Sequence, residues 1–452
     1  MTSRQPKPIK PVKPIQPSQS AKKANNKTGF LSIKKVILAI FIVGALFVCR
    51  SVYIYFELYK VIRTANMEDG SSVEMLKKPP FPAFAEKLAH IKDLPQDFNE
   101  LLNKQVSYKK DFINNAEIVE VFSKRDQEEI SLLRSEIRSV AENGIETIPE
   151  TPVITEKLDI RVPSPPYKEA RNTLRYWYLC GRYFHAIKDD ATALNLNLAS
   201  LVLLKHIENS GEDSVYLITG AMSTTFANMV SNALLEITSE LVLPADLLKT
   251  RLKELYQLYG KRSPITYFML GEKRFLPAVS PVIFNENMTE KYVETYYREL
   301  IKAYETSYSE AIKTAKEKGK LIGPQEMNLE TIVLSLVKAV FRPKNFCAEF
   351  LASMCNANYE RTFEYDFKSR QLANGALVAL TLRCYELEKG RLPDSLQELE
   401  NWFGLPMPND VYTNAPMQYN PKSNKVLFSV GSDLTPDTND DLVFVPYLNR
   451  LD

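Results

Sequence analysis

Cysteine and histidine are scarce in this chain, which holds five of the first and three of the second among 452 residues. A domain held together by disulfides needs a denser set of cysteines, so a disulfide framework is excluded. Cys347 and Cys355 have no Pro or Gly between them, and on one helix their Cα atoms would lie about 12 Å apart. We predict that both are free, because a disulfide tolerates no more than about 7 Å between Cα atoms.

Signatures of familiar enzymes are also missing. The sequence has no Gly-rich phosphate loop, no G-x-S-x-G elbow, no H-E-x-x-H pair and no kinase motif set. The histidines, His90, His185 and His206, are scattered without ExxH or CxxC neighbours, so we expect ordinary surface or core residues. An enzyme built from residues without a motif remains open.

Charge is distributed unevenly along the chain. Residues 1–35 carry nine Lys and Arg and no Asp or Glu, whereas residues 36–452 hold 48 Lys and Arg against 55 Asp and Glu, a net charge of −7. A mildly acidic body argues against a nucleic-acid-binding surface, and we expect no nucleic-acid partner.

One long apolar run interrupts this pattern, at Val36–Phe56. Its 21 residues would span about 31 Å as a helix, enough for a hydrocarbon core of roughly 30 Å. Arg50 lies near its outer end, where Tyr53 and Tyr55 fit an interfacial aromatic belt. No small-x-small cleavage site follows, so we predict a retained transmembrane helix rather than a cleaved signal peptide. The basic residues ahead of it place the N-terminus in the cytoplasm.

The N-terminal tail has prolines spaced by three, which would share one face of a polyproline II helix. A cytoplasmic partner that reads this face is one interpretation; a basic tether resting on anionic lipid is the one that we favour. The predicted organisation is a disordered tail at 1–35, a transmembrane helix at 36–56, a helical membrane-proximal region at 57–148, a Pro-rich linker at 149–166, a helical domain at 167–365 and a C-terminal α+β module at 366–452.

Apolar periodicity predicts a mainly α-helical body. The helices expected from spacing and breakers are Arg125–Glu142, Val215–Leu241, Pro244–Tyr259, Thr289–Lys318 and Leu329–Met354. The spacing Trp177-x-x-Cys180-Gly181-x-x-Phe184, followed by Ala193 and Ser200, resembles one tetratricopeptide helix-turn-helix unit. In such a unit Gly181 would allow close helix approach and Ala193 would fill the gap between the helices. Asp189 or Asp190 would cap the second helix. No second copy follows at a fixed period, which favours a bundle of helical hairpins over a solenoid.

The last part of the chain combines a helix with short strands. We expect a helix at Gln371–Lys389 that ends at Gly390, and a short helix capped by Asp394 or Ser395. Strands are expected at Met417–Asn420, Lys425–Val430 and Leu442–Val445, with the first two forming an antiparallel hairpin.

Three stretches, ALTLRCYELEKGRLPDSLQEL, LPMPNDVYTNAPMQYN and VLFSVGSDLTPDTNDDLVF, resemble the globular end of the G-type pseudopilin of bacterial type II secretion over residues 372–446. The resemblance implies a long helix on a small antiparallel sheet, and an acidic loop before the last strand that binds calcium. The whole chain is similar to uncharacterised single-pass bacterial membrane proteins that carry this module at their C-terminus. Gly29-Phe30 resembles the family's leader junction, but Lys34 stands where the family has glutamate, so we regard the module as borrowed.

The acidic loop also stands out on its residues alone. Asp433, Asp437, Asp440 and Asp441 place four carboxylates within nine residues, and such a cluster repels itself unless a cation or water relieves it. Calcium takes six to eight oxygen ligands in adaptable geometry, so these four residues are the candidate Ca²⁺ ligands. A solvated acidic turn is the alternative.

Two classes of function remain. The first is a non-enzymatic scaffold or docking protein, anchored in the bacterial inner membrane with its C-terminal domain in the periplasm, whose partners would be envelope or secretion proteins. The second is a membrane-tethered enzyme acting on envelope material, with a cleft of convergent carboxylates around Glu236 and Glu240. A divergent minor pseudopilin is a third interpretation, which requires cleavage after Gly29.

Overall fold

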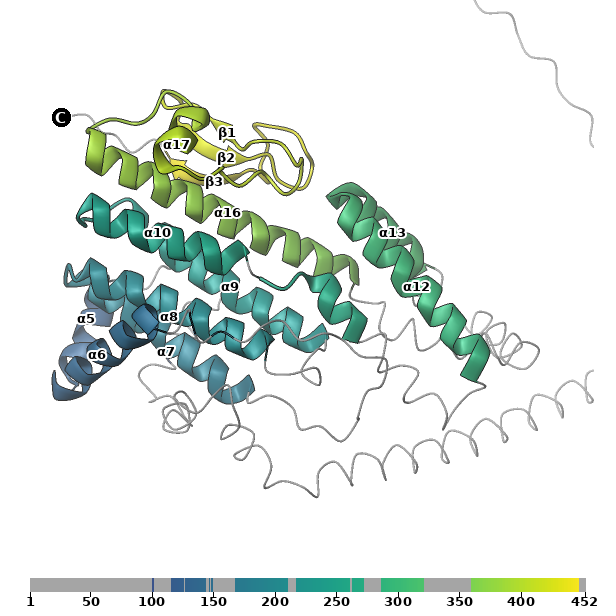
Figure 1. Cartoon of the computed structure of the whole chain (residues 1–452), viewed down its shortest axis with the longest axis horizontal. Helices are drawn as coiled ribbons and strands as arrows, with labels where there is room; N and C mark the ends of the chain where they lie inside the picture. Colours follow the sequence, from purple (N-terminus) through teal and green to yellow (C-terminus); the bar gives the residue numbers. More distant parts are fainter. Residues whose placement is uncertain are drawn as a thin grey trace, which may run out of the picture. The chain divides into compact units, whose positions relative to one another are not determined.

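The computed structural model describes residue 100 and residues 115–125, 127–143, 146, 148, 167–209, 217–260, 262–271, 286–320 and 359–446. All of them belong to the second of two units into which the chain divides, Tyr59–Asp452. The described part is mainly helical, as predicted, with one small antiparallel sheet (Figure 1). Its helices are α5 (Asn115–Ser123), α6 (Gln127–Asn143), α7 (Tyr167–Ala186), α8 (Asp190–Glu208), α9 (Leu217–Thr238), α10 (Ala245–Gly260), α12 (Glu286–Thr306), α13 (Tyr308–Lys320), α16 (Tyr359–Lys389) and α17 (Leu396–Phe403).

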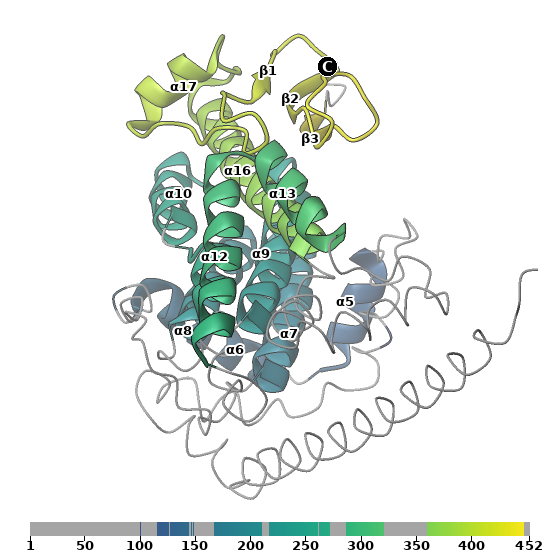
Figure 2. The same cartoon turned by 90° about the vertical axis from the view of Figure 1, so that its right-hand side faces the viewer.

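Helix α16 organises this unit. Its 31 residues extend for about 46 Å at a rise of ~1.5 Å per residue. Helices α9 and α10 pack on one side of it, and α17, β2 and β3 pack on the other (Figures 1 and 2). Gly375 permits the sheet to come close, because a Cβ at that position would collide with the ring of Phe444 in β3.

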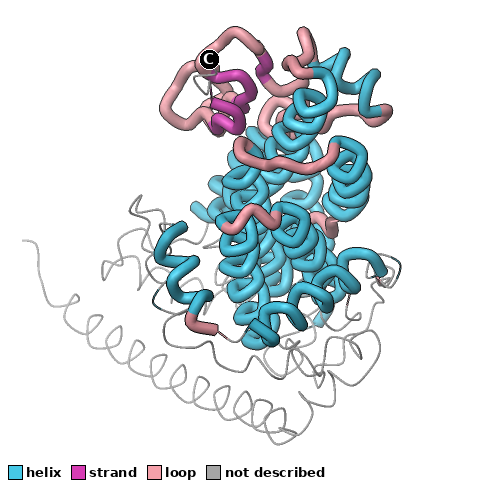
Figure 3. The backbone as a smooth tube through the Cα atoms, turned by 90° about the vertical axis from the view of Figure 1, so that its left-hand side faces the viewer, coloured by secondary structure: helices cyan, strands magenta, loops and turns pink. Residues whose placement is uncertain are grey.

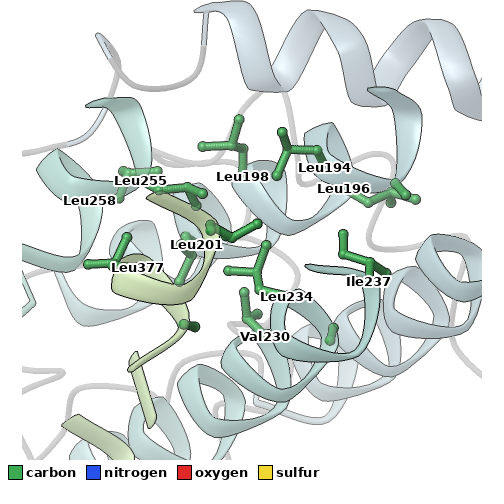
Figure 4. Packing of buried hydrophobic residues seen from close by; sticks show 14 of the residues in the cluster. Leu194, Leu196, Leu198, Leu201, Val230, Leu234, Ile237, Leu255, Leu258 and Leu377 are labelled. Atoms are coloured by element: carbon green, nitrogen blue, oxygen red, sulfur yellow. The ribbon is translucent and has the colours of Figure 1, made fainter. Parts of the chain in front are cut away.

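The apolar core follows from the leucine-rich faces of α8, α9 and α10. Figure 4 shows Leu201, Leu234 and Leu255 meeting Leu377 of α16. The stripe of α6 joins the same core, with Ile130 and Ile137 buried, which confirms the predicted amphipathic helix. Burying such side chains contributes roughly 1.5–3 kcal/mol each.

A second core is aromatic. Tyr297 and Tyr304 of α12 and Tyr308 of α13 pack with Phe363 and Phe367 of α16. These contacts explain why α16 begins at Tyr359, although the sequence pattern predicted a start at Gln371. The expected module boundary between residues 365 and 366 therefore falls inside one continuous helix.

The sheet has the order β1-β2-β3 and is antiparallel throughout, with β1 at Gln418–Tyr419, β2 at Lys425–Ser429 and β3 at Leu442–Pro446. Figure 3 shows these strands at one end of the group of helices. Tyr419 pairs with Leu427, which confirms the predicted hairpin, and Phe428 pairs with Val443.

Local capping signals determine several helix ends. Asp189 accepts a hydrogen bond from the backbone N–H of Thr192 and starts α8, and Ser395 accepts one from Glu398 and starts α17. Gly390, at φ +70°, follows α16 as predicted. The expected single helix over Thr289–Lys318 is wrong: it breaks at Ser307, whose side chain accepts from the backbone N–H of Glu310 and starts α13.

The α7–α8 pair forms the predicted helix-turn-helix, and Ala193 is fully buried. The role expected for Gly181 is wrong. A Cβ on Gly181 would lie 4.0 Å from Leu196 Cβ, an ordinary van der Waals contact, so the helices do not need a glycine there.

Several expectations lie outside the described residues: the tail, the apolar run 36–56, the Pro-rich linker and the helix over Leu329–Met354. His90, Cys347 and Cys355 lie outside them as well. Within the described ranges, Cys180 and Cys384 are buried thiols that form no disulfide.

Candidate functional site

The acidic loop between β2 and β3 divides its four aspartates into two sets. In the first, Asp440 Oδ2 accepts from the backbone N–H of Asp433 and from the Ser432 hydroxyl, both at 2.9 Å. Asp440 Oδ1 accepts from the Thr438 hydroxyl at 2.7 Å. The Thr438 hydroxyl, followed by the Asp433 N–H, holds the pKa of Asp440 well below its usual range.

The second set is built around a lysine from β2. The ammonium of Lys425 lies 2.5 Å from Asp441 Oδ2 and 3.2 Å from Asp437 Oδ1. Asp441 Oδ2 also accepts from the backbone N–H of Asp437 at 2.9 Å. Lys425 thus supplies part of the positive charge that the loop needs, a role that the run of four aspartates did not reveal.

The loop is anchored by tight backbone geometry and by helix α13. Gly431 has φ +71°, and a Cβ there would collide with the backbone of Asp440. Tyr308, the first residue of α13, lies close to the loop: burial and the charges of Glu364 and Asp440 raise the pKa of its hydroxyl, and Ser432 opposes that change. The ring of Tyr308 also meets Tyr412 at 4.9 Å between centroids. The loop is therefore attached to the helical part.

The fit of this loop to calcium is mixed. The side chain of Asp441 is only 1% exposed, and its Oδ1 is buried without a hydrogen-bond partner. That oxygen could therefore serve as a metal ligand. The four carboxylates do not converge, however, and no group of three or more His, Cys, Asp or Glu within the described ranges could hold a metal. A calcium ion would have to displace Lys425 from Asp437 and Asp441 before these oxygens became ligands.

Glu236 and Glu240, the candidate cleft carboxylates, lie beside α7. Glu236 accepts from the Tyr178 hydroxyl at 3.4 Å, and Arg182 Nε lies 3.4 Å away. Burial raises the pKa of Glu236, while Arg182 and Tyr178 oppose that change. Glu240 pairs with Lys188 at 3.3 Å. The two carboxylates are thus each matched by a cation.

His185 joins this cluster from the last turn of α7. Its Nδ1 lies 2.6 Å from Asp190 Oδ1, and its Nε2 lies 3.9 Å from Glu240. The other oxygen of Asp190 accepts from the backbone N–H of Val242 at 2.8 Å. Asp190 therefore links α7 to the α9–α10 connection, while its neighbour Asp189 serves as the cap.

Sequence reasoning missed two buried polar networks. Glu208, with no exposed surface, accepts from Lys205 at 2.6 Å, from the Ser223 hydroxyl and from the backbone N–H of Ser263. Asp366 of α16 accepts from Thr224 of α9 at 3.1 Å and from Tyr304 of α12. Each network includes a contact between residues far apart in the chain, 55 residues for Glu208 with Ser263 and 142 for Asp366 with Thr224, so no spacing in the sequence signals them.

Among known proteins, no family model, no curated protein and no solved structure matches this chain. In the part of the chain that the structure describes, no helix combines the length and the apolar character needed to cross a bilayer.

Proposed function

We propose that this protein is a non-enzymatic scaffold or docking protein of the bacterial envelope. In this proposal the apolar run 36–56 anchors it in the inner membrane, the basic tail stays in the cytoplasm, and the remainder lies in the periplasm. The observation that carries the proposal is helix α16, which joins the helical bundle and the C-terminal sheet in one piece. Such a unit presents the sheet and its loops to a partner in a fixed orientation.

The proposed resemblance to a G-type pseudopilin is supported by a long helix that packs on a small antiparallel sheet with an acidic loop before β3. The tetratricopeptide-like character of α7–α8 is supported by its short turn and the buried Ala193. Both remain likenesses in local architecture. Neither assigns the chain to a secretion pseudopilus, which would require leader cleavage after Gly29.

The enzyme alternative finds less support. Glu236 and Glu240 were the carboxylates expected to line a cleft, and each is engaged by a cation from α7 or from the α7–α8 turn. A substrate that used either carboxylate as a general base would first have to displace the cation that lies against its oxygens. Catalysis at this place would need both ion pairs to open.

Calcium binding at the acidic loop is part of the proposal. What supports it is the buried, partnerless Oδ1 of Asp441, in a loop that carries three further aspartates. Thermal melting of the whole protein with and without calcium tests it: Asp440→Ala should lower the melting temperature more in calcium than in chelator, where only the hydrogen bonds of Asp440 to Ser432, Asp433 and Thr438 are lost. An equal loss in chelator would assign Asp440 a structural role alone.

The docking role is tested in membranes. Protease added to intact spheroplasts stripped of the outer membrane should digest the body and spare the tail, and carbonate should not release the protein. Crosslinking followed by affinity purification should then recover a periplasmic or membrane partner. A body protected from protease, or a chain that washes off in carbonate, contradicts the proposed topology. The absence of any crosslinked partner contradicts the docking role.

A further inference from the structure

Helix α7 carries a basic stripe on the face that it shares with α9. Tyr178 and Arg182 lie on this face, because both contact Glu236 of α9. Residues three, four and seven apart on a helix share a face, so Arg175 and Arg171 continue the stripe toward the N-terminus of α7. Burial, and then the charge of Arg171, lowers the pKa of Arg175, in keeping with two side chains that lie close together.

Unlike Arg182, these two arginines have no acidic partner among the described residues. Neither forms a hydrogen bond or an ion pair with the residues that the structure describes. Arg171 is exposed, whereas Arg175 is partly buried, and burial followed by the nearby Arg171 lowers the pKa of Arg175. A partly desolvated guanidinium beside a second one is unfavourable until an anion pairs with them.

An apolar side chain of α9, Met229, lies on the opposite side of this face. Helices α7 and α9 run in the same direction, since Tyr178 meets Glu236 and Lys188 meets Glu240. Met229 precedes Glu236 by the same seven residues that separate Arg171 from Tyr178, so Met229 lies level with Arg171. Met229 is partly buried and packs on the core. Methionine is common at surfaces that receive a partner's apolar side chains.

The space between the helices excludes a small-molecule pocket. The crevice lined by Leu174, Tyr178 and Met229 has a volume of ≈ 10 Å³, which is sufficient for about one water molecule. A ligand must therefore lie across the face. An extended peptide with acidic side chains and an apolar anchor fits one exposed and one partly buried cation beside a methionine.

We propose that the α7–α9 face, defined by Arg171, Arg175 and Met229, binds an acidic segment of a partner protein. Carboxylates of the segment pair with Arg171 and Arg175, and an apolar side chain of the segment lies over Met229. This inference rests on the docking role proposed above, for which it names the kind of partner and the surface.

Binding of a fluorescein-labelled peptide of glutamate and leucine to the purified full chain tests the inference by fluorescence anisotropy. The double variant Arg171→Glu, Arg175→Glu removes the proposed contacts. The matched control is Arg298→Glu, Lys302→Glu on α12, an exposed basic pair with the same spacing and the same change of charge. We expect the first pair to weaken binding by about tenfold or more, because charge-assisted hydrogen bonds are strong, and the control to leave binding nearly unchanged.

Three outcomes overturn the inference. The first is that the wild-type chain does not bind the peptide, and the second is that both double variants lose peptide binding equally. The third comes from a parallel measurement with vesicles of phosphatidylglycerol and phosphatidylcholine in equal parts: Arg171→Glu, Arg175→Glu weakens binding of the chain to the vesicles but not to the peptide. The last would assign the arginines to lipid headgroups. Any of these leaves the docking role standing as long as crosslinked membranes still yield a partner of the body, so the two failures can be told apart.

Discussion

The ammonium of Lys425, in β2, lies 2.5 Å from Asp441 Oδ2. The loop that holds Asp441 showed only negative charge in the sequence. Lys425 is 31% exposed at its side chain, and the Asp441 side chain is almost completely buried. The lysine is therefore the cation of this loop in the absence of a metal. Any divalent ion that uses Asp437 and Asp441 competes with it directly.

This competition predicts the behaviour of Lys425→Met. Without the ammonium, the Asp437 and Asp441 carboxylates are left without a counter-ion, so calcium should bind about tenfold more tightly than to the wild-type chain. Isothermal calorimetry on the whole protein measures this directly. Lys422→Met is the matched control, because Lys422 is exposed in the preceding turn and should leave the affinity unchanged. If Lys425→Met binds calcium no better than the wild type, the loop is not a calcium site that Lys425 occupies.

Because α16 lies so close to the sheet at Gly375, a single added methyl group there should lower the stability of the fold. Gly375→Ala places a methyl group where the ring of Phe444 lies, and both elements are held by other contacts. Such overpacking typically costs about 1–3 kcal/mol of unfolding free energy. Urea denaturation measures the cost. Unchanged stability would mean that the sheet can move away from α16.

Gly181→Ala should have the opposite effect. The added Cβ meets Leu196 at 4.0 Å, beside a small crevice in the α7–α8–α9 bundle, so nothing has to move. Replacing glycine by alanine inside a helix stabilises it by roughly 0.5–1 kcal/mol. The same urea titration should show a higher midpoint. A lower midpoint would mean that the close packing of α7 and α8 needs a glycine at position 181 after all.

Local signals in the sequence predicted local structure well. The Asp189 cap, the Gly390 helix end and the hairpin of β1 and β2 each depend on residues within a few positions of one another. Composition and periodicity likewise indicated the mainly helical class. In each case the information is carried by φ preference, capping or side-chain alternation along one short stretch.

Contacts between distant segments could not be predicted in this way. Asp366 meets Thr224, which is 142 residues earlier, and Lys188 meets Glu240 across 52 residues. The four aspartates of the loop were found from their spacing, but the lysine that separates two of them from the others comes from β2. Helix α16 extends past its predicted start because Tyr359 and Phe363 pack with α12, a tertiary effect that outweighs the local pattern.

The buried His206 should make the free energy of unfolding fall in acid. Its side chain is 1% exposed, and burial lowers its pKa from 6.5 to about 4. The unfolded chain therefore binds a proton at higher pH than the folded one does. The contribution of this residue is fully present above pH 6.5, and it is lost as the pH falls from about 6.5 to about 4. At about 1.4 kcal/mol per pH unit, the loss approaches roughly 3 kcal/mol.

The comparison that isolates this effect is His206→Gln, which keeps a polar side chain without a titrating group. Urea midpoints measured from pH 7 to pH 4 should fall less steeply in His206→Gln than in the wild type, although the variant starts from a lower stability at pH 7. His185→Gln is the contrasting variant, because His185 is a second buried histidine that, unlike His206, lies 2.6 Å from a carboxylate, that of Asp190. If both variants and the wild type lose stability in parallel, carboxylates rather than His206 govern the response to acid.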